Sequence, residues 1–223
     1  MCGRFTLHTD LEQIQQVFKI DETAAEPQPS YNIAPTQPVL SVLRRDGKTT
    51  LVEMRWGLIP FWAKDPSIGS RMINARAESL SAKTSFKRPF KSQRCLIVSD
   101  GFYEWRKDGT QKVPMFIHLK SGEPFGFAGL YDTWKSPEGE VWTTCTIITG
   151  EPNALVKPIH DRMPVIIPGK QQAAWLDPAN QDTAKLSKLL VPYPAGEMQA
   201  YPVSRLVNSV QNNSPQLIEP LAA

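Results

Sequence analysis

The chain has 223 residues and a mass of 25.0 kDa, which suits one large domain or two small ones whose core needs no disulfides. With 41% apolar and 21% charged residues it has the composition of a soluble protein, and no apolar run approaches the roughly eighteen residues of a membrane helix. A net charge of +3 permits an anionic partner without requiring one.

The cysteine content argues against extracellular chemistry. Cys2, Cys95 and Cys145 are an odd number of cysteines with no C-x-x-C spacing, which disfavours a disulfide framework and a zinc site and fits a reducing compartment. No basic and apolar leader opens the sequence, so we expect a cytoplasmic protein that is not inserted in a membrane. Twenty prolines against thirteen glycines favour short strands joined by rigid turns.

The first half of the chain predicts one short helix and one hairpin. Thr9 or Asp10 can cap a helix whose apolar stripe has helical spacing, formed by Leu11, Ile14 and Phe18. Residues 39–45 and 50–56 are rich in strand formers, and Asp46-Gly47 between them is a strong hairpin signal. We expect a loop at 57–70, an extended segment at 71–78 and a mixture of helix and loop at 79–94.

The second half predicts strands in quick succession. We expect strands at 95–105, 113–119, 125–131 and 141–149, joined by glycine- and proline-containing turns in the pattern of an antiparallel meander. One or two helical turns at 153–159, helices at 173–176 and 183–191, and a strand at 198–203 should follow. With no repeat or linker, the sequence predicts a single α+β domain over residues 1–223, built on a curved antiparallel sheet or barrel with a few peripheral helices.

The N-terminus could carry unusual chemistry. Removal of Met1 would leave Cys2 with a free α-amine and a thiol on adjacent carbons, both partly reactive near neutral pH. An amine condenses with an aldehyde to a Schiff base, and the neighbouring thiol can then close a thiazolidine ring. The alternative is that the second residue is cysteine by chance, and the dipeptide alone favours that interpretation.

Three polar segments could supply partners for such chemistry. Asn74, Arg76 and Glu78 alternate with small apolar residues along one predicted strand, although an ordinary half-exposed strand explains that pattern more simply. Glu104 lies among large aromatic residues, which would raise the pKa of its carboxyl group if the surroundings are dry; the alternative is a solvent-facing glutamate. His160 follows a proline-containing turn, where either a catalytic or a structural histidine can occur.

Aromatic and basic residues suggest a surface for nucleic acid. Trp56, Phe61 and Trp62 surround a proline bend and could stack on unpaired bases if exposed, or form core if buried. Between Glu78 and Asp100 the chain has no acid, and its cations alternate with phenylalanines in a pattern that would suit phosphates or a solvated basic face. These cations are Lys83, Lys87, Arg88, Lys91 and Arg94.

Taken together, seven motifs closely resemble the SOS response-associated peptidase family, whose members are abasic-site processing proteins. The resemblance runs from residue 2 to about residue 208, and the segment after Asn208 matches least. The motifs are Met1-Cys2-Gly3-Arg4-Phe5, Tyr31-Asn32-Ile33-Ala34-Pro35, Arg55-Trp56-Gly57-Leu58-Ile59-Pro60, Ile73-Asn74-Ala75-Arg76-Ala77-Glu78, Asp100-Gly101-Phe102-Tyr103-Glu104-Trp105, His160-Asp161-Arg162-Met163-Pro164 and Pro202-Val203-Ser204.

The resemblance implies a single α+β domain with a β-barrel-like antiparallel core and a basic groove for single-stranded DNA. It also implies a thiazolidine crosslink between the N-terminal cysteine and the ring-opened aldehyde of an abasic site. Four residues match the family's catalytic positions: Cys2, Asn74, Glu104 and His160. Six match positions that contact DNA: Arg4, Asn32, Trp56, Trp62, Arg76 and Arg162. His160 would move a proton on the sugar ring oxygen, Glu104 would serve the dehydration to the imine, and Asn74 would hold the amine or hydroxyl.

Partners and alternatives follow from the same resemblance. We expect a monomer that binds single-stranded DNA containing abasic sites, needs no metal or organic cofactor, and associates with the nucleoid when it is bound to DNA. One alternative is a cysteine peptidase of the N-terminal-nucleophile type, whose activity could be limited to removal of its own Met1. A second alternative is a protein that reads modified or single-stranded DNA without any covalent step.

Overall fold

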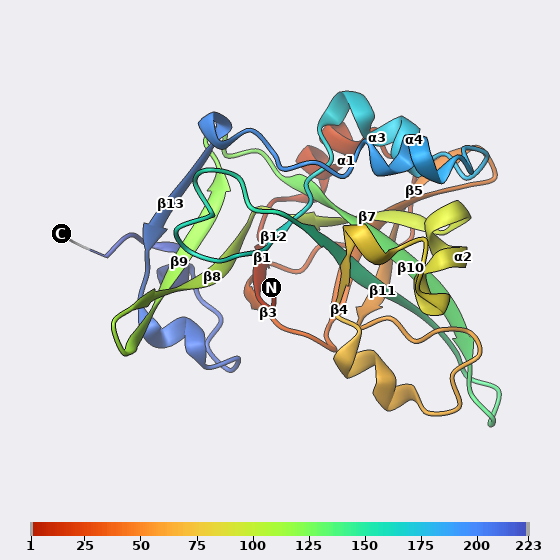
Figure 1. The fold of residues 1–223 in the computed structure, drawn as a ribbon, viewed down its shortest axis with the longest axis horizontal. Coiled ribbons are helices and arrows are strands. Elements are labelled where there is room, and N and C mark those ends of the chain that lie inside the picture. Colours follow the sequence, from red (N-terminus) through yellow and green to blue (C-terminus); the bar gives the residue numbers. More distant parts are fainter. Residues whose placement is uncertain (1, 222–223) are drawn as a thin grey trace.

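The computed structural model describes residues 2–221, which form an α+β fold around a closed five-stranded barrel (Figure 1). The larger sheet has the order β12-β11-β10-β7-β4-β5-β2, and a parallel pairing of β11 with β5 closes the ring. Its strands are β2 (Glu22–Thr23), β4 (Pro38–Arg45), β5 (Lys48–Trp56), β7 (Arg94–Ser99), β10 (Phe125–Lys135), β11 (Val141–Gly150) and β12 (Met163–Pro164). The predicted barrel-like core is therefore confirmed.

A smaller sheet of five strands stands beside the barrel, in the order β13-β9-β8-β1-β3. It consists of β1 (Phe5–Leu7), β3 (Ser30–Ile33), β8 (Gly101–Asp108), β9 (Gln111–Leu119) and β13 (Met198–Pro202). A short strand, β6 (Asn74–Arg76), pairs in parallel with β11 and is followed by the 3-10 turn η2 (Ala77–Ser79). The alternation expected through Glu78 therefore stops two residues earlier, because the chain turns at Ala77.

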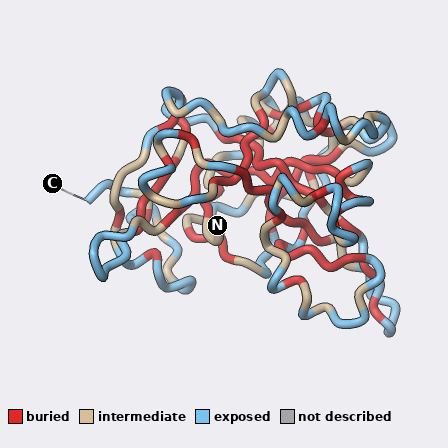
Figure 2. Tube along the Cα trace, in the orientation of Figure 1, coloured by how far each residue is buried: buried red, intermediate tan, exposed pale blue. Residues whose placement is uncertain are grey.

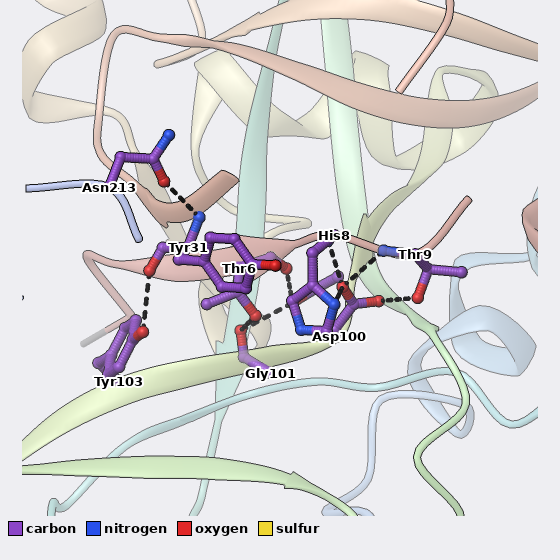
Figure 3. A network of polar contacts seen from close by, with 9 residues as sticks. Thr6, His8, Thr9, Tyr31, Asp100, Gly101, Tyr103 and Asn213 are labelled. Carbon is purple, nitrogen blue, oxygen red and sulfur yellow. Dashed lines mark hydrogen bonds and ion pairs between the residues drawn. The ribbon is translucent and has the colours of Figure 1, made fainter. Parts of the chain in front are cut away.

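The expected single strand at 95–105 is wrong, and the expected meander holds only for the hairpins β8–β9 and β10–β11. The chain leaves the barrel after Ser99 and enters the smaller sheet at Gly101, so β7 pairs with β10 while β8 pairs with β9. At the break, the buried Asp100 carboxylate accepts hydrogen bonds from the Thr9 amide at 3.1 Å and the Thr9 hydroxyl at 2.6 Å (Figure 3). A Cβ on Gly101 would lie 2.4 Å from the ring of Phe116, so only glycine fits this crossing point.

Short helices cover parts of the barrel (Figure 1). α1 (Leu11–Phe18) is capped by Asp10, whose side chain accepts from the Gln13 amide, and it buries Ile14 and Phe18 as its spacing predicts. α2 (Thr84–Ser92) packs against β10 and β7, and α3 (Gly169–Leu176) packs against β7; α4 (Thr183–Ser187) is shorter than expected. Residues 154–159 form hydrogen-bonded turns without a helix.

Burial divides the described chain into two apolar clusters (Figure 2). The larger fills the barrel and includes Cys2, while the smaller joins Tyr103 and Phe116 to residues near the C-terminus. No helix in the described part of the chain is long and apolar enough to span a membrane.

Arg94 belongs to the core and not to the basic face that the sequence suggested. It is 2% exposed, and its guanidinium donates to five backbone carbonyls, those of Phe90, Lys91, Trp175, Asp177 and Asn180. Burial lowers the pKa of Arg94 to about 10, which still leaves the group charged at neutral pH. The residue therefore fastens the end of α2 to the loop after α3.

Arg94→Met should cost at least about 3 kcal/mol of unfolding free energy, because several buried carbonyls lose their donor together. Urea unfolding followed by tryptophan fluorescence measures this loss. Lys87→Met, at an exposed position of α2, is the matched control and should change stability by less than about 0.5 kcal/mol. Equal stability of the two variants would contradict the assignment of Arg94 to the core.

Candidate functional site

Asn74 fixes the backbone of Cys2. Its strand β6 runs beside β11, with Asn74 opposite Ile147, and its side-chain amide donates to the Cys2 carbonyl oxygen at 2.7 Å. Cys2 itself is fully buried, and the Asn74 side-chain oxygen is buried without a hydrogen-bond partner among the described residues. The Asn74 side chain thus holds the backbone of residue 2 through its amide nitrogen and leaves its oxygen available as a hydrogen-bond acceptor.

Glu104 approaches Cys2 from the smaller sheet, and His160, in the loop between β11 and β12, lies beside Glu104. Glu104 lies in β8, is 3% exposed, and has a carboxylate oxygen 3.9 Å from Nε2 of His160. Burial raises the pKa of the Glu104 carboxyl group, and the neighbouring His160 moderates the increase. A raised pKa favours the protonated form that a general acid needs, as the aromatic surroundings in the sequence suggested.

The tautomer of His160 follows from its neighbours. Its Nδ1 accepts a hydrogen bond from the Arg162 backbone amide at 2.9 Å and also lies 2.9 Å from a carboxylate oxygen of Asp161. The two contacts make opposite demands, because the amide needs an acceptor and the carboxylate needs a donor. The amide is fixed by the chain, whereas the exposed Asp161 can turn into water, so we assign the proton of the neutral ring to Nε2, which faces Glu104.

The Cys2 thiol is in a setting that keeps it protonated. Burial raises the pKa of this thiol well above its ordinary value, and the negative charge of Glu104 raises it further. The thiol therefore enters any reaction as S–H, and an acceptor for its proton must appear during that reaction.

Arg4 and Asn32 are brought together, but both are engaged by the chain itself. Arg4 donates from Nη1 to the Asn32 side-chain oxygen at 2.7 Å and to the Val207 carbonyl at 2.7 Å. Asn32 is 2% exposed, and its amide donates to the carbonyls of Ser209 and Asn212. The hydrogen bonds of Asn32 are therefore made within the fold, whereas the Arg4 side chain remains partly exposed.

Arg76 is exposed at the end of β6, and Arg162 is held in a forked ion pair. The Arg162 guanidinium donates to both carboxylate oxygens of Glu78, at 2.8 and 2.9 Å, and to the Thr149 carbonyl at 2.7 Å. This pair lowers the pKa of Glu78. Glu78, which the sequence placed on a strand with Asn74, thereby orients the residue that follows the His160-Asp161 corner.

The two tryptophans predicted to contact DNA have different environments. Trp56 is fully buried, donates from its indole to the Ile73 carbonyl at 2.8 Å and packs edge-on against Phe5, so it is a core residue and offers no face to a base. Trp62 is 45% exposed, next to an exposed Phe61 whose ring lies 4.1 Å beneath the Arg88 guanidinium. Arg88 also forms an ion pair with Asp132, so its charge is already balanced within the fold.

Two hollows border the Cys2 site. One, of about 610 Å³, contains Asn74 and is lined by Arg71, Arg76 and Lys83 without any acid. The other, of about 940 Å³, contains His160 and Trp105 and has both cations and acids in its wall. Arg71 was missed in the sequence, because a single arginine at the start of an expected extended segment gives no signal until the fold places it beside Arg76.

A family model confirms what the motifs suggest. The model described as SOS response associated peptidase (SRAP) matches residues 1–210. The chain belongs to this family. Among the described residues of this family member, no group of three or more His, Cys, Asp or Glu side chains is arranged to hold a metal ion.

Relatives with assigned names and solved structures agree with this membership. The abasic site processing protein YoqW of Bacillus subtilis is 53% identical over 98% of this chain and 99% of its own length. The abasic site processing protein HMCES of Gallus gallus is 36% identical over 86% of this chain and 66% of its own length. A crystal structure of a protein from Bacteroides thetaiotaomicron superposes with a TM-score of 0.87 at 27% identity, covering 99% of this chain and 100% of that one.

Glu104→Gln should stabilise the fold at neutral pH. Because the folded-state pKa of Glu104 is raised, the folded chain holds this proton more tightly than the unfolded chain, and stability falls as the pH rises from the unfolded pKa through the folded one. An amide removes that loss. Calorimetry from about pH 4 to about pH 8 should show that the increase in Tm of the variant over the parent grows with pH. Each kcal/mol of added stability corresponds to about 2–4 °C in Tm for a chain of this size.

Glu78→Gln is the matched control with the opposite sign. The Arg162 pair lowers the folded-state pKa of Glu78, so its stabilisation is present above the unfolded pKa and is lost as the pH falls. This variant should therefore lose stability at neutral pH and match the parent in acid. A Glu104→Gln variant that behaves like Glu78→Gln would contradict the burial argument.

Proposed function

We propose that this protein processes abasic sites in single-stranded DNA by forming a covalent crosslink through Cys2. The observation that carries the proposal is the hydrogen bond of 2.7 Å from Asn74 to the Cys2 carbonyl, together with the Glu104–His160 pair on the opposite side. A 1,2-aminothiol held between an amide and a carboxyl–imidazole pair is suited to an aldehyde. The names of the relatives, abasic site processing proteins, support the same substrate.

The chemistry balances without any further reactant. After Met1 is removed, the Cys2 amine adds to the aldehyde carbon, and the carbinolamine loses one water to give an imine. The thiol then adds across the C=N bond, with sulfur bonding to carbon and the proton going to nitrogen. That transfer supplies the proton acceptor that the buried S–H requires.

Glu104 and His160 have separate tasks in this scheme. A Glu104 carboxyl group with a raised pKa can protonate the departing hydroxyl during dehydration. His160, with its proton on the nitrogen that faces Glu104, is placed to exchange a proton with the sugar ring oxygen and so open the hemiacetal. The Asn74 side chain orients the amine for attack on the aldehyde carbon.

The acid-free hollow is the proposed path of the DNA backbone. Arg71, Arg76 and Lys83 line it beside Asn74, so phosphates bound there would lie next to the reacting residue. Exposed Trp62 and Phe61 are aromatic residues that unpaired bases could stack on.

Cys2→Ser should retain imine formation and lose the stable product. The serine variant keeps the α-amine but has no thiol to close the thiazolidine, so its adduct with abasic single-stranded DNA should persist only after borohydride reduction. Denaturing mass spectrometry of untagged protein reports the adduct, which for the parent should weigh the sum of protein and DNA minus one water. An unreduced, stable Cys2→Ser adduct would refute the thiazolidine.

Two controls accompany that measurement. Cys145→Ser removes a buried thiol far along the sequence and should leave the adduct intact if the variant folds. A peptide library incubated with the parent tests the peptidase alternative, because turnover that depends on Cys2 and occurs without an adduct on DNA would favour that class instead.

Arg76→Gln should weaken binding to single-stranded DNA and flatten its dependence on salt. If Arg76 neutralises one phosphate, the slope of log affinity against log salt should fall by about 0.7. Fluorescence anisotropy across a salt series measures the slope. Arg45→Gln, at the turn between β4 and β5, removes the same charge outside the hollow and should leave the slope unchanged; equal slopes for the two variants would exclude the proposed path.

A further inference from the structure

The last described residues, Ser204–Leu221, form what we call the C-terminal strap (Figure 1). The strap contains the 3-10 turns η4 (Arg205–Asn208) and η5 (Pro215–Ile218) and ends where the Leu221 amide donates to the Pro202 carbonyl. Val207 and Leu217 are fully buried against Tyr103 and Phe116 of the smaller sheet. The strap is therefore packed as part of the fold.

Polar contacts join the strap to the strands that carry site residues. The Tyr31 amide donates to the Asn213 side chain at 2.7 Å, and the Tyr103 hydroxyl donates to the Tyr31 carbonyl at 2.8 Å (Figure 3). Tyr103 immediately precedes Glu104 in β8. The strap thus contacts β3 directly and, through Tyr31, is linked to β8, the strand that bears the proposed general acid.

Two strap contacts reach residues next to the proposed reaction centre. The Val207 carbonyl accepts from Arg4, two residues from Cys2, and the Asn208 side-chain oxygen accepts from the Trp105 indole at 2.8 Å. Trp105 follows Glu104 and lines the hollow that contains His160, with the Arg4 guanidinium 6.0 Å from its ring. An indole has a single donor, so this one acceptor sets how the ring lies in the wall.

We propose that Asn208 is a positioning residue for DNA binding, acting through Trp105. By accepting from the indole, Asn208 fixes the Trp105 ring in the wall of the hollow that contains His160, along which we place the strand carrying the abasic site. The inference rests on the proposed function for its ligand, single-stranded DNA with an abasic site. Asn208 lies near the C-terminal end of the residues that the family model matches, 1–210.

A double-mutant cycle tests the proposal. Asn208→Ala and Trp105→Phe should each weaken binding of a single strand containing tetrahydrofuran, an abasic analogue that cannot open to an aldehyde, by about 3- to 10-fold, as expected for loss of one hydrogen bond. Because both changes remove the same contact, their effects should not add, and the affinity of the double variant should equal that of the single variant that binds less tightly. Fluorescence anisotropy gives the affinities, and thermal unfolding checks that each variant is folded.

The rate of crosslinking distinguishes an effect on DNA binding alone from a general loss of order around the reacting groups. At saturating abasic DNA, Asn208→Ala should crosslink at the rate of the parent, because the change affects how DNA is held and not the reacting groups. Asn180→Ala, which removes an exposed side-chain hydrogen bond to the Ala174 carbonyl in another loop, is the matched control and should alter neither quantity.

Unchanged affinity in Asn208→Ala, or losses that simply add in the double variant, would overturn the proposal. The binding measurements decide this even if the crosslink fails, since the tetrahydrofuran strand does not react. A parent chain that binds this strand but forms no adduct with abasic DNA would instead refute the proposed function alone.

Discussion

The crossing of the chain between the two sheets at Asp100-Gly101 is the constraint on which the site depends. Gly101 leaves no room for a side chain against Phe116, and Asp100 is anchored by the backbone and hydroxyl of Thr9. Beyond the crossing, β8 pairs with β1, and the Tyr103 amide donates to the Arg4 carbonyl at 2.9 Å. That pairing brings the N-terminal residues alongside Glu104, whereas Asn74 approaches from the barrel.

The site combines groups that cost stability with groups that restore it. A buried carboxyl group with a raised pKa and a buried thiol are arranged for chemistry and contribute little to holding the fold together. The neighbouring Glu78–Arg162 pair and the five carbonyls around Arg94 provide compensating contacts within the described chain. The need for such stabilising contacts explains why Arg94 and Arg162, which the sequence suggested for phosphate or DNA contacts, bind groups within the fold instead.

Local patterns predicted local structure well. The helix capped by Asp10 and the hairpin at Asp46-Gly47 follow from short-range rules, and the structure has both. The strand break at Asp100 could not be predicted, because Asp100 is held there by Thr9, 91 positions away in the sequence. Trp56 and Arg94 show the same limit: tryptophan and arginine are common in cores and at DNA surfaces alike, and only packing distinguishes the two.

The sequence by itself determined the family, the barrel-like α+β class and the identity of the chemical groups, since these reside in short motifs and in residue types. Only the tertiary structure decided which groups meet. The Asn74 amide reaches the Cys2 carbonyl across 72 positions of sequence, and the Asn208 side chain reaches Trp105 across 103. Such contacts depend on sheet pairing and side-chain packing over long separations, which no local periodicity encodes.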